Sequence, residues 1–155
     1  MMGKFYSTKT YGNDRGLSCV FRQWKATHSH CSLLHGYSIG VKVVFECDTL
    51  DERNWVMDFG GLKEFKSWLE YMFDHTLLIA EDDPNIEVFK SLSKEICDIR
   101  IVGAVGCERF SEMVYNKLKE ILCQQAFNGF LLNETVRVKT VEVFEHGANS
   151  AIYEG

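Results

Sequence analysis

Two short stretches of the chain combine residue types that carry out acid–base or metal chemistry. In the first, His28, His30, Cys31 and His35 fall within eight residues, just ahead of Tyr37. Imidazole nitrogens and thiolate sulfurs are ligands that zinc prefers, so this stretch predicts a metal site or a catalytic site. The alternative interpretation is a polar loop whose histidines are hydrated by solvent.

The second stretch is the pair Asp74-His75, at the end of a segment with helical periodicity. An aspartate beside a histidine can fix the imidazole tautomer and support it as a general acid or base. The alternative is a histidine favoured there by the helix dipole, beside a solvated carboxylate. The remaining histidine, His146, follows Glu145 at the end of an expected strand, where a carboxylate becomes a ligand anchor only if it is buried.

The elements that must position these residues are indicated by hydrophobic periodicity. Strands are expected over 17–26, 34–47, 136–145 and 150–153, with a turn over 146–149 and a short extended piece over 55–59. Helices are expected over 61–73 and 108–123, and a shorter one over 85–96. Within 34–47, His35 and Tyr37 project to the same side and would face one site. The order predicts an α+β fold, with helices on one face of a four-stranded antiparallel sheet.

Composition limits the class of protein. The chain has 155 residues, a net charge of -5, 46% apolar residues and 25% charged residues, which indicates one folded domain over 1–155 rather than disorder. No basic cluster is present to neutralise phosphates, which argues against nucleic acid as a partner. The sequence contains no recognisable secretion signal and no long apolar run, so we expect a cytoplasmic protein that does not span a membrane.

The six cysteines and the sheet edges support two further expectations. The cysteines are scattered, without a Cys-x-x-Cys pair, so reduced and mostly structural thiols are expected. A four-stranded sheet has two exposed edges that invite pairing with other copies, which predicts a symmetric homo-oligomer.

Four motifs together resemble the 6-pyruvoyl- and 6-carboxytetrahydropterin synthase family, in a diverged bacterial-type form. They are Cys31-x-x-x-His35-Gly-Tyr37, Trp55-Val-Met-Asp58-Phe59-Gly-Gly-Leu62-Lys63, Phe73-Asp74-His75-Thr-Leu77-Leu78, and Glu145 with Tyr153. The resemblance covers roughly 17–83 and 107–154, and 84–106 is similar to an insertion. It implies the tunnelling fold (ββααββ), assembled as a homohexamer that forms an oligomeric barrel, with active sites between subunits.

The resemblance also implies roles for individual residues. Cys31 matches the catalytic thiolate, and Asp74 with His75 matches a second proton-transfer pair. Glu145 matches the glutamate that accepts hydrogen bonds from the N3–H and 2-amino groups of the pterin. Glu112 matches the glutamate of a helix start in the family, and Glu108 is a competing match.

The family binds zinc through three histidines, and this sequence departs from that pattern. Only His35 matches, because Tyr37 occupies the position of a second ligand and Lys25 falls where the first-strand histidine is expected. A zinc ion is therefore expected on His30 and His35, with His28 as the third ligand. The alternative is a site without zinc.

Two functions follow from these observations. The first is a lyase that acts on 7,8-dihydroneopterin triphosphate and forms 6-carboxytetrahydropterin, on the route to 7-deazaguanine nucleosides such as queuosine, or 6-pyruvoyltetrahydropterin. The second is a non-catalytic pterin- or purine-binding oligomer with a lost or altered metal site, which the departures at Tyr37 and Lys25 motivate.

Overall fold

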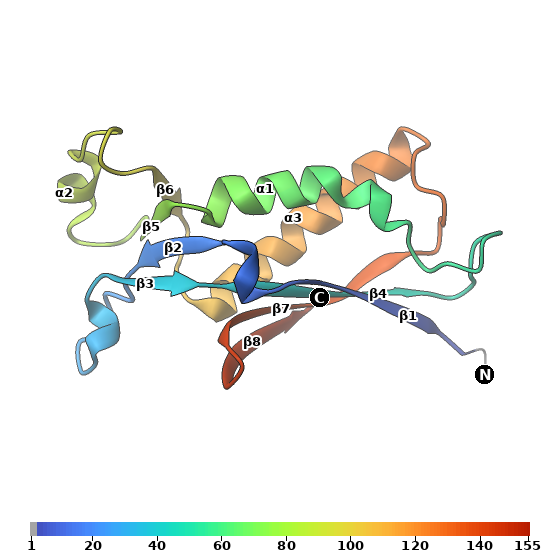
Figure 1. Cartoon of the computed structure of the whole chain (residues 1–155), viewed down its shortest axis with the longest axis horizontal. Helices are drawn as coiled ribbons and strands as arrows, with labels where there is room; N and C mark the ends of the chain where they lie inside the picture. Colours follow the sequence, from blue (N-terminus) through green and yellow to red (C-terminus); the bar gives the residue numbers. More distant parts are fainter. Residues whose placement is uncertain (1–2) are drawn as a thin grey trace.

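A four-stranded antiparallel sheet, covered on one face by two long helices, forms the body of the molecule in a computed structural model that describes residues 3–155 (Figure 1). The strands, in their order across the sheet, are β1 (Phe5–Tyr11), β4 (Gly40–Cys47), β7 (Arg137–His146) and β8 (Asn149–Glu154). The covering helices are α1 (Lys63–Phe73) and α3 (Cys107–Phe127). The predicted α+β class and the ββααββ order are confirmed.

The core lies between this sheet and the helices, as the alternation of apolar residues predicts. Val41, Val43 and Phe45 of β4 are fully buried, and so are Val141 and Val143 of β7. The long helix α3 presents a matching apolar stripe at three- and four-residue steps, comprising Phe110, Val114, Leu118 and Ile121. Contact between the two apolar faces therefore fixes which face of the sheet the helices cover.

The prediction for the first strand was wrong. Within 17–26 only β2 (Ser18–Phe21) is a strand, and it belongs to a second sheet. The first strand of the main sheet is instead β1, which pairs with β4 from Phe5↔Cys47 to Tyr11↔Val41. Because β1 is an edge strand with most of its side chains exposed, it lacks the apolar alternation that reveals a half-buried strand.

The second sheet has the order β3-β2-β5-β6, with β3 (His35–Ser38), β5 (Thr76–Ala80) and β6 (Ile99–Val102). β2 pairs antiparallel with β3 and parallel with β5, and β5 pairs parallel with β6. Neither β5 nor β6 was predicted. All five residues of β5 are buried, and a short continuous apolar run carries no periodicity that separates strand from helix.

The predicted strand over 34–47 is divided between the two sheets. It breaks at Ile39, whose backbone N–H donates to the carbonyl of Leu17 at 3.0 Å. The half that holds His35 and Tyr37 is β3 of the second sheet, and the half from Gly40 onwards is β4 of the main sheet. The junction of the two sheets therefore lies directly beside the residues singled out for chemistry.

The helical predictions differ from the structure mainly in length. The 61–73 helix is α1, preceded by the 3-10 turn η3 (Phe59–Leu62), and the 108–123 helix extends to 107–127 as α3. The expected helix over 85–96 is only α2 (Ile86–Lys90), and 55–59 contains no strand. None of the helices in the described part of the chain has the length and apolar character to cross a bilayer.

Candidate active site

Tyr37 is at the centre of a cluster of side chains supplied by four different elements. Burial raises the pKa of Tyr37 to about 12, and the carboxylate of Glu145 on β7 acts in the same direction, as do the nearby thiols of Cys31 and Cys107. Cys31 lies in the 3-10 turn η2 (His30–Ser32), and Cys107 begins α3. Groups far apart in the sequence are therefore close enough to act on the phenol electrostatically where the two sheets join.

The side chains of Tyr37 and His35 form a fixed pair. The ring of Tyr37 stacks on that of the fully buried Phe21, with centroids 4.0 Å apart, and its hydroxyl hydrogen-bonds to Nε2 of His35. Nδ1 of His35 lies 2.9 Å from the carbonyl of Leu33, which can only accept. In a neutral imidazole Nδ1 is then the donor, and Nε2 accepts from the phenol.

Glu145 lies at an irregularity of its strand. The register between β7 and β8 shifts between Phe144 and His146, so Glu145 occupies a bulge, a feature that redirects a side chain. The amide of Asn13 donates to the carbonyl of Glu145 at 3.1 Å and to that of Ser38 at 2.5 Å. Asn13 thereby joins the end of β7 to the end of β3, a role that periodicity in the sequence did not indicate.

Cys107 has a role at the site that the sequence analysis did not assign. Its sulfur lies 4.0 Å from Oε1 of Glu145, at the N-terminus of α3. Burial, followed by the charges of Glu145 and Glu108, raises the pKa of Cys107 to about 12, so the thiol stays protonated and can donate to the carboxylate. Its position directly before the expected 108–123 helix was the one signal in the sequence.

The two competing glutamates of α3 have different surroundings. Glu108 lies in the first turn of the helix, next to Cys107 and on the same end as Glu145. Glu112, one turn further along, is ion-paired with Arg109 at 2.9 Å. Of the two, Glu108 is the one whose charge acts on Cys107, the thiol beside Glu145.

The expected zinc ligands do not form a site. Within residues 3–155 the structure brings together no group of three His, Cys, Asp or Glu side chains able to hold a metal ion. His28 and His30 are exposed, and the nitrogen of His35 that is free of a proton is engaged by Tyr37. The donor set of His28, His30 and His35 therefore does not fit a zinc ion in this chain.

The side chain of Lys25 forms an ion pair with the loop that follows β5. Its ammonium pairs with Asp82 at 2.9 Å, and the same carboxylate accepts from Nε1 of Trp24 at 3.1 Å. These hydrogen bonds hold the pKa of Asp82 below its usual range. The segment that leads from β2 into the Cys31 turn is thus tied to the loop that follows β5.

The predicted pair of Asp74 and His75 is formed. Nδ1 of His75 lies 2.5 Å from Oδ1 of Asp74, and the backbone N–H of His75 donates to the carbonyl of Ser18 at 2.6 Å. His75 has φ 57°, which non-glycine residues rarely adopt, and its side chain is 87% exposed. Within the described part of the chain, no hydrogen bond joins this pair to the Tyr37 cluster.

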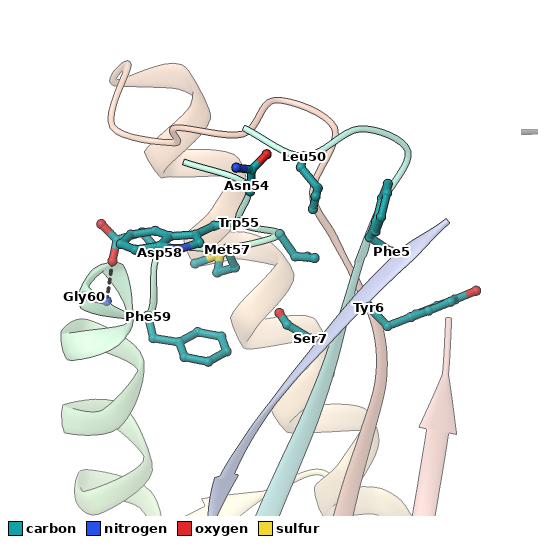
Figure 2. A pocket seen from close by; sticks show the side chains of 11 residues that line it. Phe5, Tyr6, Ser7, Leu50, Asn54, Trp55, Met57, Asp58, Phe59 and Gly60 are labelled. Atoms are coloured by element: carbon teal, nitrogen blue, oxygen red, sulfur yellow. Dashed lines mark hydrogen bonds between the residues drawn. The ribbon is translucent and has the colours of Figure 1, made fainter. Parts of the chain in front are cut away.

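A cavity lies near the start of β1, away from the Tyr37 cluster (Figure 2). It has a volume of about 560 Å³, and apolar side chains such as Phe5, Trp55 and Phe59 line it. The carboxylate of Asp58 lies at its wall and accepts from the backbone of Gly60 at 2.9 Å, which caps η3. The cavity shares no lining residue with the Tyr37 cluster and contains no pair of groups for proton transfer.

Comparisons with known proteins agree on one family. The sequence model described as 6-pyruvoyl tetrahydropterin synthase matches residues 13–155. The chain is 30% identical over 127 residues to the 6-carboxy-5,6,7,8-tetrahydropterin synthase of Aquifex aeolicus, which covers 80% of this chain and 75% of that protein. A protein of the same name from Rickettsia typhi is 33% identical over 57 residues, or 36% of this chain and 41% of that protein.

Solved structures show the same fold. The 6-pyruvoyl tetrahydropterin synthase of Plasmodium falciparum superimposes with a TM-score of 0.70 at 14% identity, over 98% of both chains. An uncharacterized protein of Wolinella succinogenes does so with a TM-score of 0.70 at 20% identity, over 99% of this chain and 98% of the other. At these identities the likeness establishes the fold alone, and the tunnelling fold that the resemblance implied is confirmed.

Proposed function

The chain belongs to the 6-pyruvoyl tetrahydropterin synthase family, and on that premise we propose that it is a lyase acting on 7,8-dihydroneopterin triphosphate. Of the two expected products, 6-carboxytetrahydropterin is favoured over 6-pyruvoyltetrahydropterin, because the relative matched over 80% of this chain is named a 6-carboxy-5,6,7,8-tetrahydropterin synthase. A place on the route to queuosine and a cytoplasmic location stay predictions.

The arrangement around Glu145 carries this proposal. A carboxylate accepts two parallel hydrogen bonds, which suits the adjacent N3–H and 2-amino donors of a pterin. The bulge and the amide of Asn13 fix its backbone, and the neutral thiol of Cys107 lies against one of its oxygens. Such support from three sides holds a recognition carboxylate in one orientation, and lowers the entropy lost when a ligand binds.

Proton transfer is assigned to the groups that the resemblance implied. Cys31 lies in η2, just ahead of the strand that carries Tyr37, and would be one of the bases for a pterin held by Glu145. The pair of Asp74 and His75 would serve as a second acid–base group, since the aspartate fixes the imidazole tautomer. The exposure of His75 in the single chain agrees with a site completed by another copy.

We further propose a homohexamer with sites between subunits. β1 and β8 are the unpaired edges of the main sheet, and an exposed strand edge is a template for pairing with another chain. On β1 the side chains of Phe5 and Tyr6 are 46% and 54% exposed beside the large apolar cavity. Light scattering coupled to size-exclusion chromatography measures the assembly, and a monomeric mass would contradict this part of the proposal.

The activity is tested by incubating the purified protein with 7,8-dihydroneopterin triphosphate, with and without added zinc, and following products by mass spectrometry. Glu145→Gln is expected to weaken pterin binding about tenfold or more, because a charged hydrogen bond contributes roughly 1.5–3 kcal/mol. Glu142→Gln, on the same strand, is the matched control and should bind as the wild type does. Unchanged binding by Glu145→Gln would refute the proposed anchor.

The second candidate function, a non-catalytic pterin- or purine-binding oligomer, is favoured by Tyr37 and Lys25 at positions where the family has metal ligands. It predicts pterin binding that depends on Glu145, but no product under either metal condition. The same incubation therefore separates the two functions.

A further inference from the structure

The imidazole of His35 is already saturated with hydrogen bonds inside the chain. Its Nδ1 lies 2.9 Å from the carbonyl of Leu33, and its Nε2 is bonded to the hydroxyl of Tyr37. A metal ion binds only a nitrogen without a proton, which here is Nε2. A metal on His35 would therefore have to replace the hydrogen bond between Nε2 and the phenol of Tyr37.

Tyr37 is not free to move aside. Its ring stacks on Phe21 at a centroid separation of 4.0 Å and an interplanar angle of 11°, and Phe21 in turn meets Phe110 edge-on at 5.0 Å. Phe21 and Phe110 are both completely buried. Displacing the phenol would disturb the packing of the core beneath the site.

The third expected ligand position holds the positively charged side chain of a lysine. Lys25 falls where a first-strand ligand is expected, and it is held by Asp82 at 2.9 Å, together with Trp24. An ammonium group has no lone pair for a metal. The side chains at all three expected ligand positions, His35, Tyr37 and Lys25, thus form contacts with other residues of the protein.

We infer that this chain works without a metal ion at the three-ligand position, and that the hydrogen-bonded pair of Tyr37 and His35 contacts the substrate there. The inference rests on the proposed function for the identity of that substrate. Asn13 joins the carbonyl of Ser38, the residue after Tyr37, to that of Glu145, so a pterin anchored on Glu145 would lie beside the end of β3 that carries the phenol. The phenol oxygen, whose proton is donated to His35, keeps a lone pair that can accept a hydrogen bond from a hydroxyl group of the pterin's side chain.

The first test measures metal directly. The wild-type protein is equilibrated with an equal concentration of Zn²⁺ and a chromogenic zinc chelator, and metal content after dialysis is measured by inductively coupled plasma mass spectrometry. We expect far less than about one zinc per chain, and turnover unchanged by chelator treatment. About one tightly held zinc per chain, with activity lost on chelation and restored by Zn²⁺, would overturn the inference.

Two variants complete the test. The double variant Lys25→His/Tyr37→His restores imidazoles at the two departing positions, and it should gain zinc in the same assay whether or not it is active. Tyr37→Phe should lower kcat/KM about ten- to hundredfold, the loss expected for one substrate hydrogen bond. Tyr71→Phe, on the exposed face of α1, is the control and should leave kcat/KM unchanged.

The outcomes keep this inference separate from the proposed function. Turnover that requires zinc supports the proposed function and refutes the inference. Absence of turnover with and without zinc refutes the proposed function, and the metal content of the wild type still decides the inference. A Tyr37→Phe variant with wild-type kcat and wild-type KM would refute the contact between the phenol and the substrate.

Discussion

Replacing Asp83 with asparagine is expected to destabilise the protein by about 3 kcal/mol. Both oxygens of Asp83 accept from the guanidinium of Arg22, at 2.7 and 2.8 Å, and the carboxylate side chain is only 2% exposed. Breaking a buried pair by removing one charge costs about 3–5 kcal/mol, because the remaining charge is left without a partner. The lower figure applies since Arg22 is 19% exposed and regains some hydration.

Urea unfolding followed by circular dichroism measures this change. With a typical slope of about 2 kcal/mol per molar urea, the midpoint should fall by about 1.5 M. All samples are compared at one protein concentration, because assembly contributes to apparent stability. The control is Glu70→Gln, which removes the exposed ion pair with Lys66 and should cost about 0.5 kcal/mol or less.

The pH dependence provides an independent check. The hydrogen bonds from Arg22 hold the pKa of Asp83 below its ordinary value, so its contribution is complete above the unfolded-state pKa near 4 and is lost as the pH falls through the folded pKa. The difference between the wild type and Asp83→Asn should therefore be constant near neutral pH and shrink below about pH 4. A midpoint shift no larger than that of Glu70→Gln, or a difference independent of pH, would refute the argument.

Two further predictions concern the support of the site. Phe110→Ala should cost about 3–5 kcal/mol in urea unfolding, because it leaves a cavity beneath Phe21, and a loss below 1 kcal/mol would contradict this account of the core. Gly40→Ala should weaken pterin binding measured by fluorescence titration, since an added Cβ would lie 2.2 Å from the ring of Phe144 and push the strand next to Glu145; Gly147→Ala, where nothing lies within 4 Å, should bind normally.

The two long helices, the central strands of the main sheet and much of the core could be read from the sequence, because apolar periodicity reports burial directly. β4, β7, α1 and α3 were predicted within a few residues at most boundaries. β1 and β5 were missed for opposite reasons, since the first is largely exposed and the second is buried on every side. In both cases the pattern that identifies a strand is absent from the strand itself.

The sequence alone indicated the family, which the comparisons confirm, and it supplied the candidate residues Cys31, His35, Asp74, His75 and Glu145 through their types and the resemblance. Only the tertiary structure decided what surrounds them. The hydrogen bond from Tyr37 to His35, the bulge at Glu145 and the thiol of Cys107 beside it depend on contacts between β3, β7 and α3, which lie far apart in the chain. Spacing specifies which groups a chain carries, whereas packing determines which lone pairs remain available to a ligand.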